Sequence, residues 1–296
     1  MRQQIIDEIK KELEGMVEEG TAITFSTTEK NNGVKYQTVM LKKPDQKVVP
    51  MIYIDEQIKA IVTGRTTARQ VAQNIVRINK EQQNDKIPDA IGNFGKEMIL
   101  DKVGYQIINK EKNLDRLADV PHKDFLDLAV MYRVEVMLDE STSGTILVHN
   151  NHMEKIGISF EELDEAAKRN TERNGFLVRP LAAVLSKMMG LTEEEAMAVS
   201  QNGDMTHIMT NEKRIHGAAI MLYSNYFEEL AEKLHDDLFI IPSSVHELLA
   251  LPAKRISKEA VERMVEEVND TDVDDDEILS YTVYRYSREE KKLIIA

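Results

Sequence analysis

The chain has 296 residues, of which 42% are hydrophobic and 30% charged, a balance typical of globular proteins with a buried core. Acidic residues outnumber basic ones by 52 to 38, and the formal net charge of −14 disfavours nucleic acid and anionic membrane surfaces as partners. Because cysteine is absent, disulfides, thiolate catalysis and cysteine-bound metals are excluded. No apolar run approaches the roughly 20 residues of a spanning helix, and residues 1–17 lack the apolar stretch of a signal peptide, so we expect a cytoplasmic protein.

The first part of the chain predicts a hairpin between helices. Apolar residues recur at helical spacing from Ile5 to Val17. Asn32-Gly33 separates two runs rich in β-branched and aromatic residues, and this pair favours the positive φ angles of a tight turn. The expected strands are 21–28, 34–41 and 48–54, followed by a helix that begins at Thr66 or Thr67 and buries Val71, Ala72, Ile75 and Ile78.

The middle of the chain reads mainly as strands. The pattern predicts strands over 98–108, 126–138 and 145–149, with a short helix that holds Leu114 and Leu117.

Helix-capping signals are clearest after residue 152. Ser159 with Glu162 and Thr192 with Glu195 have the spacing of capping boxes, and Ser257 is placed to cap a helix. The remaining expected elements are a helix from Pro180 to Gly190, a helix around Phe227, and strands over 205–209, 218–223, 238–241, 281–286 and 293–295.

Two stretches of the chain resemble each other. The string GYQII at 104–108 corresponds to GAAIML at 217–222, and similar short strings follow each in the same order. A short match of this kind also arises by coincidence. The sequence therefore predicts an α+β fold of two related halves, residues 1–152 and 153–296, each a small, mainly antiparallel sheet covered by helices.

The segment from Pro242 to Glu247, read as PSSVHE, carries the candidate catalytic residues Ser243, Ser244 and His246. In an extended strand Ser244 and His246 point the same way, as a nucleophile and its base would, and Glu247 points the opposite way. The alternative is a turn whose hydroxyls and imidazole satisfy backbone groups. Candidate binding residues are Glu247, Asn211 and His122, although Asn at the end of an element is more often a cap.

Metal binding is not expected. His149 and His152 have a spacing that can share a metal, but no further ligands accompany them. The aspartates at 270, 272 and 274 resemble a calcium loop, yet Asp275 replaces its glycine and Tyr281 its bidentate glutamate. We expect no metal and no cofactor.

Several strings of the chain together are similar to one family. They lie at 121–134, 170–171, 209–219, 239–247, 264–269 and 278–286. In this order they resemble DUF5688, a domain-of-unknown-function family of uncharacterised proteins from anaerobic gut bacteria. The resemblance implies no activity or ligand, and it marks PSSVHE as a hallmark. Tyr281 departs from the family pattern, which has Asp after the string ILS.

Whether the chain is an enzyme stays open at this stage. Because no catalytic set is complete, we expect a non-catalytic binding or regulatory module, with an unknown protein or small molecule as its partner and a homodimer as one expected assembly. The alternative is a serine/histidine hydrolase that uses residues 242–247.

Overall fold

The computed structural model describes residues 1–44, 46, 49–81, 95–137, 143–190, 192, 194–195 and 205–296. Over these residues, helices and three antiparallel sheets confirm the α+β class. The chain separates into two compact units, residues 1–94 with 137–144, and residues 95–136 with 145–296. The expected boundary between residues 152 and 153 falls inside the second unit and stays a prediction.

The first unit holds a three-stranded sheet in the order β1-β2-β3 and its helices. Its elements are α1 (Arg2–Glu14), β1 (Ala22–Glu29), η1 (Asn31–Gly33), β2 (Lys35–Lys42), β3 (Ile52–Tyr53), α2 (Asp55–Val62) and α3 (Ala68–Glu81). The apolar faces of α1 and α3 share one core, in which Ile9, Leu13 and Ile75 are almost completely buried. The expected helical spacing therefore identifies the packed faces correctly.

The expected hairpin is confirmed. Asn32 and Gly33 have φ angles of 60° and 70°, and the N–H of Lys30 donates to the carbonyl of Val34 to close the loop. The third strand, predicted over 48–54, is present as Ile52–Tyr53, and residue 48 lies outside the described residues. Helix α2 follows from Asp55, whose carboxylate accepts the backbone N–H of Gln37 at 2.7 Å.

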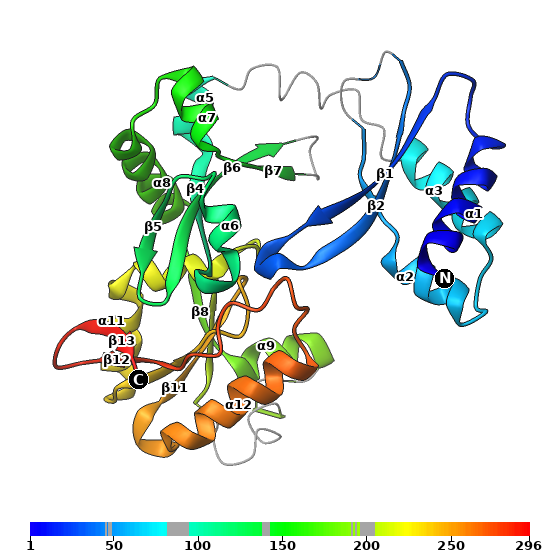
Figure 1. Cartoon of the computed structure of the whole chain (residues 1–296). Helices are drawn as coiled ribbons and strands as arrows, with labels where there is room; N and C mark the ends of the chain where they lie inside the picture. The colour runs from blue at the N-terminus through cyan, green and yellow to red at the C-terminus, as the bar shows by residue number, and fades with distance from the viewer. Residues whose placement is uncertain are drawn as a thin grey trace. The chain divides into compact units, whose positions relative to one another are not determined.

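The rest of the chain supplies two further sheets (Figure 1). One has the order β4-β6-β5, with β7 also paired to β6, and the other the order β13-β12-β10-β11-β9-β8. The strands are β4 (Val103–Asn109), β5 (His122–Phe125), β6 (Leu128–Met137), β7 (Ser143–Leu147), β8 (Leu177–Pro180), β9 (His207–Thr210), β10 (Leu238–Ile241), β11 (Leu248–Pro252), β12 (Tyr284–Ser287) and β13 (Lys292–Ile295). The helices are α5 (Lys96–Lys102), η2 (Glu111–Asn113), α6 (Leu114–Leu117), α7 (Asn150–Ile156), α8 (Phe160–Asn174), α9 (Leu181–Met189), η3 (Gly217–Leu222), α11 (Ser224–Leu234), η4 (Ala253–Arg255) and α12 (Lys258–Thr271).

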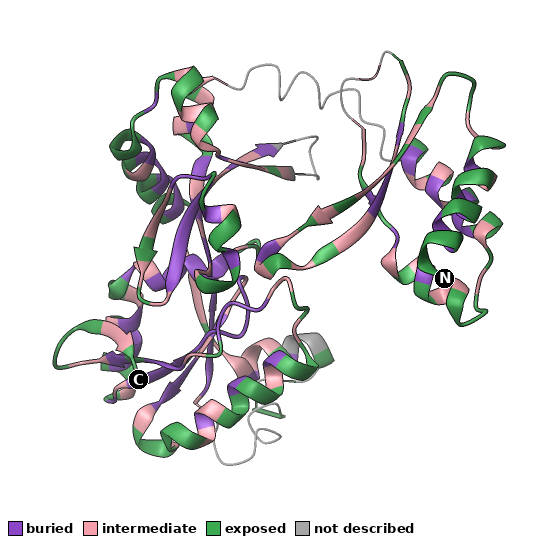
Figure 2. Ribbon diagram, viewed as in Figure 1, coloured by how far each residue is buried: buried purple, intermediate pink, exposed green. Residues whose placement is uncertain are grey.

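Helices cover both of these sheets. Strand β6 is buried over most of its length, as Figure 2 shows, which explains its nearly continuous apolar sequence. Helix α8 is joined to β4 through Asn170, whose amide donates to the carbonyl of Val103 at 2.9 Å, and through Thr171, whose hydroxyl accepts the N–H of Tyr105 at 3.0 Å. Val261 and Val265 of α12 pack on the six-stranded sheet.

Two predicted strands differ from the structure, one at its start and one over its whole length. Residues 96–102 form α5, so the strand expected from residue 98 begins only at Val103. The strand expected over 218–223 is not present, because residues 217–222 form the 3₁₀ helix η3. A short run of buried residues has no periodicity that distinguishes strand from helix. The string at 104–108 is strand and its counterpart at 217–222 is helix, so the internal repeat is not confirmed.

Candidate functional site

Residues 242–247 form the connection between β10 and β11, and the extended strand considered for them is not present. Pro242 has no N–H to continue the ladder, which ends at the pair Ile241 and Leu249. The N–H of Ser243 donates to the carbonyl of Ile241 at 3.0 Å, and that of Ser244 to the carbonyl of Glu247 at 3.2 Å. Both serines are buried in this turn.

Every polar atom of His246 has a hydrogen-bond or ion-pair partner within the protein. Its backbone N–H donates to the hydroxyl of Ser244 at 3.0 Å, and its carbonyl accepts the hydroxyl of Thr210 at 2.8 Å. In the ring, Nδ1 accepts the backbone N–H of His216 at 3.0 Å, and Nε2 lies 3.3 Å from Oε1 of Glu277. An acceptor Nδ1 requires the neutral ring to carry its proton on Nε2, where it faces the carboxylate.

The acid beside His246 comes from a distant part of the chain. The N–H of Val245 donates to the carbonyl of Glu277 at 2.9 Å, which holds the turn after α12 against this connection. The carboxylate beside the imidazole therefore belongs to Glu277. Glu247, the candidate next to His246 in the sequence, contributes its backbone carbonyl to the turn.

Gly217 lies in close contact with the same group. A Cβ atom at this position would lie 2.3 Å from Oγ1 of Thr210, 2.5 Å from the carbonyl oxygen of His246 and 2.8 Å from the backbone nitrogen of Asn211. Only glycine permits so close an approach of η3 to β9 and the 242–247 connection.

Asn211 closes the loop that leads to Gly217. Its amide donates to the carbonyl of Ile215 at 2.8 Å and accepts the N–H of the same residue at 3.2 Å. The candidate binding residue therefore has a structural role in the 211–216 loop.

His216 is the last residue of that loop, and its backbone is in the left-handed region, with φ at 55°. Its ring centroid lies 5.4 Å from that of His246. Burial, reinforced by the positive charge of Arg133, lowers the pKa of His216 to about 2, so its imidazole is neutral near pH 7.

A small cavity of about 30 Å³ adjoins His216. It is lined by Lys102, Gly104, Tyr105, Arg133, Glu135, Thr171, Asn174, Gly175, Phe176, Asn211, His216 and Ala219. Two of these residues have a buried polar atom without a hydrogen-bond partner, Nε of Arg133 and Nδ1 of His216. Such orphaned atoms are uncommon in folded proteins and call for an explanation.

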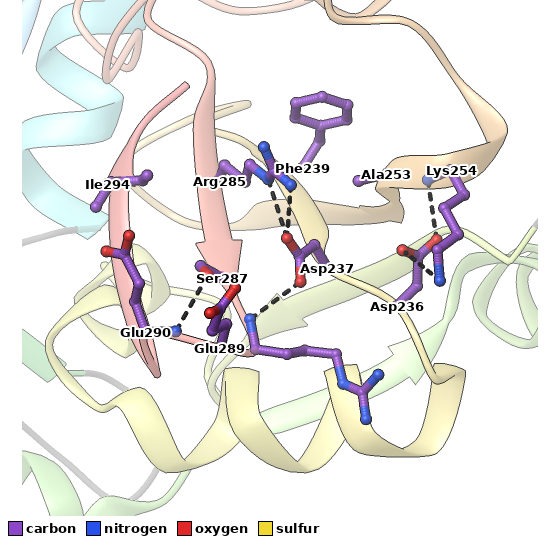
Figure 3. A pocket seen from close by; sticks show the side chains of 11 residues that line it. Asp236, Asp237, Phe239, Ala253, Lys254, Arg285, Ser287, Glu289, Glu290 and Ile294 are labelled. Carbon is purple, nitrogen blue, oxygen red and sulfur yellow. Dashed lines mark hydrogen bonds and ion pairs between the residues drawn. The ribbon is translucent and has the colours of Figure 1, made fainter.

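A larger hollow of about 570 Å³ lies elsewhere, against β10, β12 and β13, and Figure 3 shows its lining. Asp237 accepts Nη2 of Arg285 at 2.7 Å and the N–H of Arg288 at 3.0 Å. Burial alone would raise the pKa of Asp237, but these hydrogen bonds outweigh burial and lower it. Most of the hollow's charged groups already have partners, among them Asp237 with Arg285 and Asp236 with Lys254, and none of the sequence candidates lines it, so it is the weaker site.

The other histidine candidates also have partners within the protein. Nδ1 of His122 donates to the carbonyl of Val120 at 3.0 Å at the start of β5. Nδ1 of His149 lies 2.7 Å from Asp119, and Nδ1 of His152 accepts the N–H of His149 at the start of α7. Among the described residues, no group of three or more His, Cys, Asp or Glu side chains could hold a metal ion. Within the same residues, no helix is long and apolar enough to cross a membrane.

The structure therefore places His246, Ser244 and Asn211 in one group, together with residues that the sequence reading missed: His216, Thr210, Glu277 and Arg133. Arg133 had a visible signal, because it is a cation within the apolar run of β6. His216 and Glu277 had none, since their contacts depend on long-range folding.

These features define an α+β protein with antiparallel sheets and a polar group centred on His216 and His246. The chain belongs to the family described as "Family of unknown function (DUF5688)", whose pattern matches residues 2–288. The family expected from the sequence strings is confirmed. No curated protein and no solved structure matches the chain.

Proposed function

We propose that the chain is a non-catalytic binding module. The observation that carries the proposal is the state of His246, whose Nδ1 accepts the backbone N–H of His216 while Nε2 faces Glu277. A serine hydrolase needs one imidazole nitrogen hydrogen-bonded to the serine hydroxyl so that the ring can accept its proton. The hydroxyl of Ser244 instead accepts the backbone N–H of His246.

The rival function is the serine/histidine hydrolase. One contact favours it, because Glu277 approaches the imidazole from a distant segment, as the acid of a catalytic triad does. The nitrogen that would then have to face a serine is Nδ1, and the backbone of His216 occupies it. Catalysis would require this hydrogen bond to break, so that Nδ1 of His246 could accept the proton of a serine hydroxyl.

A serine-reactive fluorophosphonate probe separates the two functions. We expect no adduct on Ser243 or Ser244 when the native protein is treated and its peptides are analysed by mass spectrometry. An active serine protease in a parallel reaction controls for probe quality. An adduct on Ser244 that disappears in His246→Ala would favour the hydrolase and overturn the binding module.

The location and assembly expected from the sequence belong to the same proposal. A chain without cysteine suits a reducing compartment, and this supports a cytoplasmic location. A homodimer and an unknown protein partner remain predictions. Of the candidate binding residues, Asn211 lines the small cavity, and this supports the binding of a small molecule there.

A further inference from the structure

Arg133 is a partly buried cation on β6, in the middle of a sheet. Arg133 pairs with Gly104 across β6 and β4, and its sequence neighbours Tyr132 and Val134 are completely buried. Its Nε is buried without a hydrogen-bond partner, and no ion pair of Arg133 occurs among the described residues. A cation that is partly removed from water and has a buried donor without a partner is costly, so a compensating partner is expected.

The acid nearest in sequence is already engaged. Burial lowers the pKa of Arg133, and the negative charge of Glu135 opposes this effect only in part. The carboxylate of Glu135 forms an ion pair with Lys213. Meanwhile Lys102 lines the same cavity, so basic groups outnumber acidic ones around it although the whole chain has a net charge of −14. This local excess of positive charge favours an anion over a neutral guest.

The second orphaned atom lies on the same cavity. Nδ1 of His216 is buried without a partner, and His216 and Arg133 both contribute to the lining. A neutral imidazole can carry a proton on Nδ1 and donate it to an anion without adding charge. Arg133 would supply the charge and His216 a second hydrogen bond.

The volume limits the guest to a small group. About 30 Å³ exceeds the roughly 10 to 15 Å³ that one water requires, and it suits a group of a few atoms. Water would satisfy the orphaned donors but would leave the charge of Arg133 uncompensated. A planar monoanion matches the flat edge of a guanidinium, whereas phosphate is larger and tetrahedral.

We propose that the cavity between β4, β6 and η3 binds the carboxylate group of a small molecule through Nε of Arg133 and Nδ1 of His216. This inference rests on the proposed binding function. The rest of such a molecule would lie outside the cavity, which has room for the carboxylate alone.

Nitrogen-15 NMR tests this directly, because an arginine Nε–H gives its own resonance. The peak of Arg133 is identified by its loss in Arg133→Met. Sodium formate and sodium acetate are titrated into the full-length protein at constant ionic strength, with sodium chloride and sodium phosphate as separate arms. We expect a saturable shift of this peak with formate or acetate. An unchanged peak in every arm, or a shift with chloride or phosphate alone, would overturn the proposal.

Thermal unfolding provides a second readout. Formate should raise the melting temperature of the wild type and of the control Arg255→Met, which removes an exposed arginine that does not line the cavity. In Arg133→Met the rise should disappear. In Arg133→Lys, which keeps the charge but loses the flat edge, formate should bind about tenfold more weakly. An equal rise in all variants would overturn the proposal. The serine-probe experiment is independent, so failure here leaves the non-catalytic assignment standing.

Discussion

The backbone N–H of His216 donates a hydrogen bond of 3.0 Å to Nδ1 of His246. This bond joins two loops that are thirty residues apart in the sequence, and it determines which nitrogen of His246 carries the proton. The imidazole is therefore an acceptor for the protein's own backbone and a support for the 211–216 loop.

Replacement of His246 by the two amide residues should distinguish its two nitrogens. Asn places an oxygen near the position of Nδ1 and can still accept the His216 N–H, whereas Gln reaches toward the position of Nε2. We expect His246→Gln to lower the free energy of unfolding by about 1 to 3 kcal/mol, because a buried N–H loses its acceptor, and His246→Asn to lower it less. Urea unfolding followed by circular dichroism measures both. Equal losses would mean that the Nδ1 contact contributes nothing.

Gly217→Ala should be strongly destabilising for a steric reason. The added methyl would lie 2.3 Å from Oγ1 of Thr210 and 2.5 Å from the carbonyl oxygen of His246, so backbone segments must separate. Overpacking of this kind costs about 1 to 3 kcal/mol, and we expect the upper end because two of the three contacted atoms, the carbonyl oxygen of His246 and the nitrogen of Asn211, are backbone. Gly15→Ala is the control, because its nearest contact would be an ordinary 3.6 Å. The two melting temperatures should differ by several degrees, and similar values would contradict the contact.

Local signals in the sequence predicted local structure well. The capping box of Ser159 and Glu162 is present, and Ser257 accepts the N–H of Ala260 at the start of α12. The positive φ angles at Asn32 and Gly33 were predictable because few other residues adopt them readily. Each of these features depends on residues within four positions of one another.

The candidate site was only half predictable. The string around His246 drew attention because it is polar between apolar strands, but its partners come from the loop before η3 and the turn after α12. No spacing rule connects His216 or Glu277 with His246, since tertiary folding alone brings them together. The turn at 242–247 was one of two readings of the sequence. Pro242 favoured it over a strand, because proline cannot donate to a sheet ladder.

Asp164 should make stability depend on acidic pH. Burial alone would raise the pKa of this carboxyl, but hydrogen bonds from Lys123 at 2.6 Å and from Tyr105 and Tyr132, both at 2.8 Å, outweigh burial and lower it. A lowered folded-state pKa adds stability above the unfolded value of about 3.9, and this stability is lost as the pH falls through the folded value.

Asp164→Asn should therefore unfold more easily near pH 7, by about 2 kcal/mol, because an amide accepts these hydrogen bonds without the charge. The deficit should be constant above about pH 5 and shrink toward pH 3 as the wild-type carboxyl becomes protonated. Asp124→Asn is the matched control, since Asp124 pairs with Lys110 on the surface, where an ion pair contributes little. Urea titrations at several pH values measure the deficit. A deficit that does not change with pH would rule out the ionised carboxylate as its source.

Asp127 anchors the segment that leads into β12. Its carboxylate accepts the hydroxyls of Ser280 at 3.1 Å and of Thr282 and Tyr284, both at 2.8 Å. Tyr284 is completely buried, so Asp127→Ala leaves its hydroxyl without an acceptor in the core. We expect a loss of about 3 kcal/mol and faster amide hydrogen exchange over residues 279–284.

A double-mutant cycle separates the orphaned hydroxyl from other effects of the Asp127 substitution. Tyr284→Phe alone should be destabilising, because the carboxylate loses a donor. In the Asp127→Ala background the same change should restore part of the stability, because it removes the hydroxyl that has lost its partner. Unfolding free energies of the four proteins give the coupling, which should be about 1 kcal/mol or more. If the two losses simply add, the hydrogen bond between Tyr284 and Asp127 does not hold this segment in place.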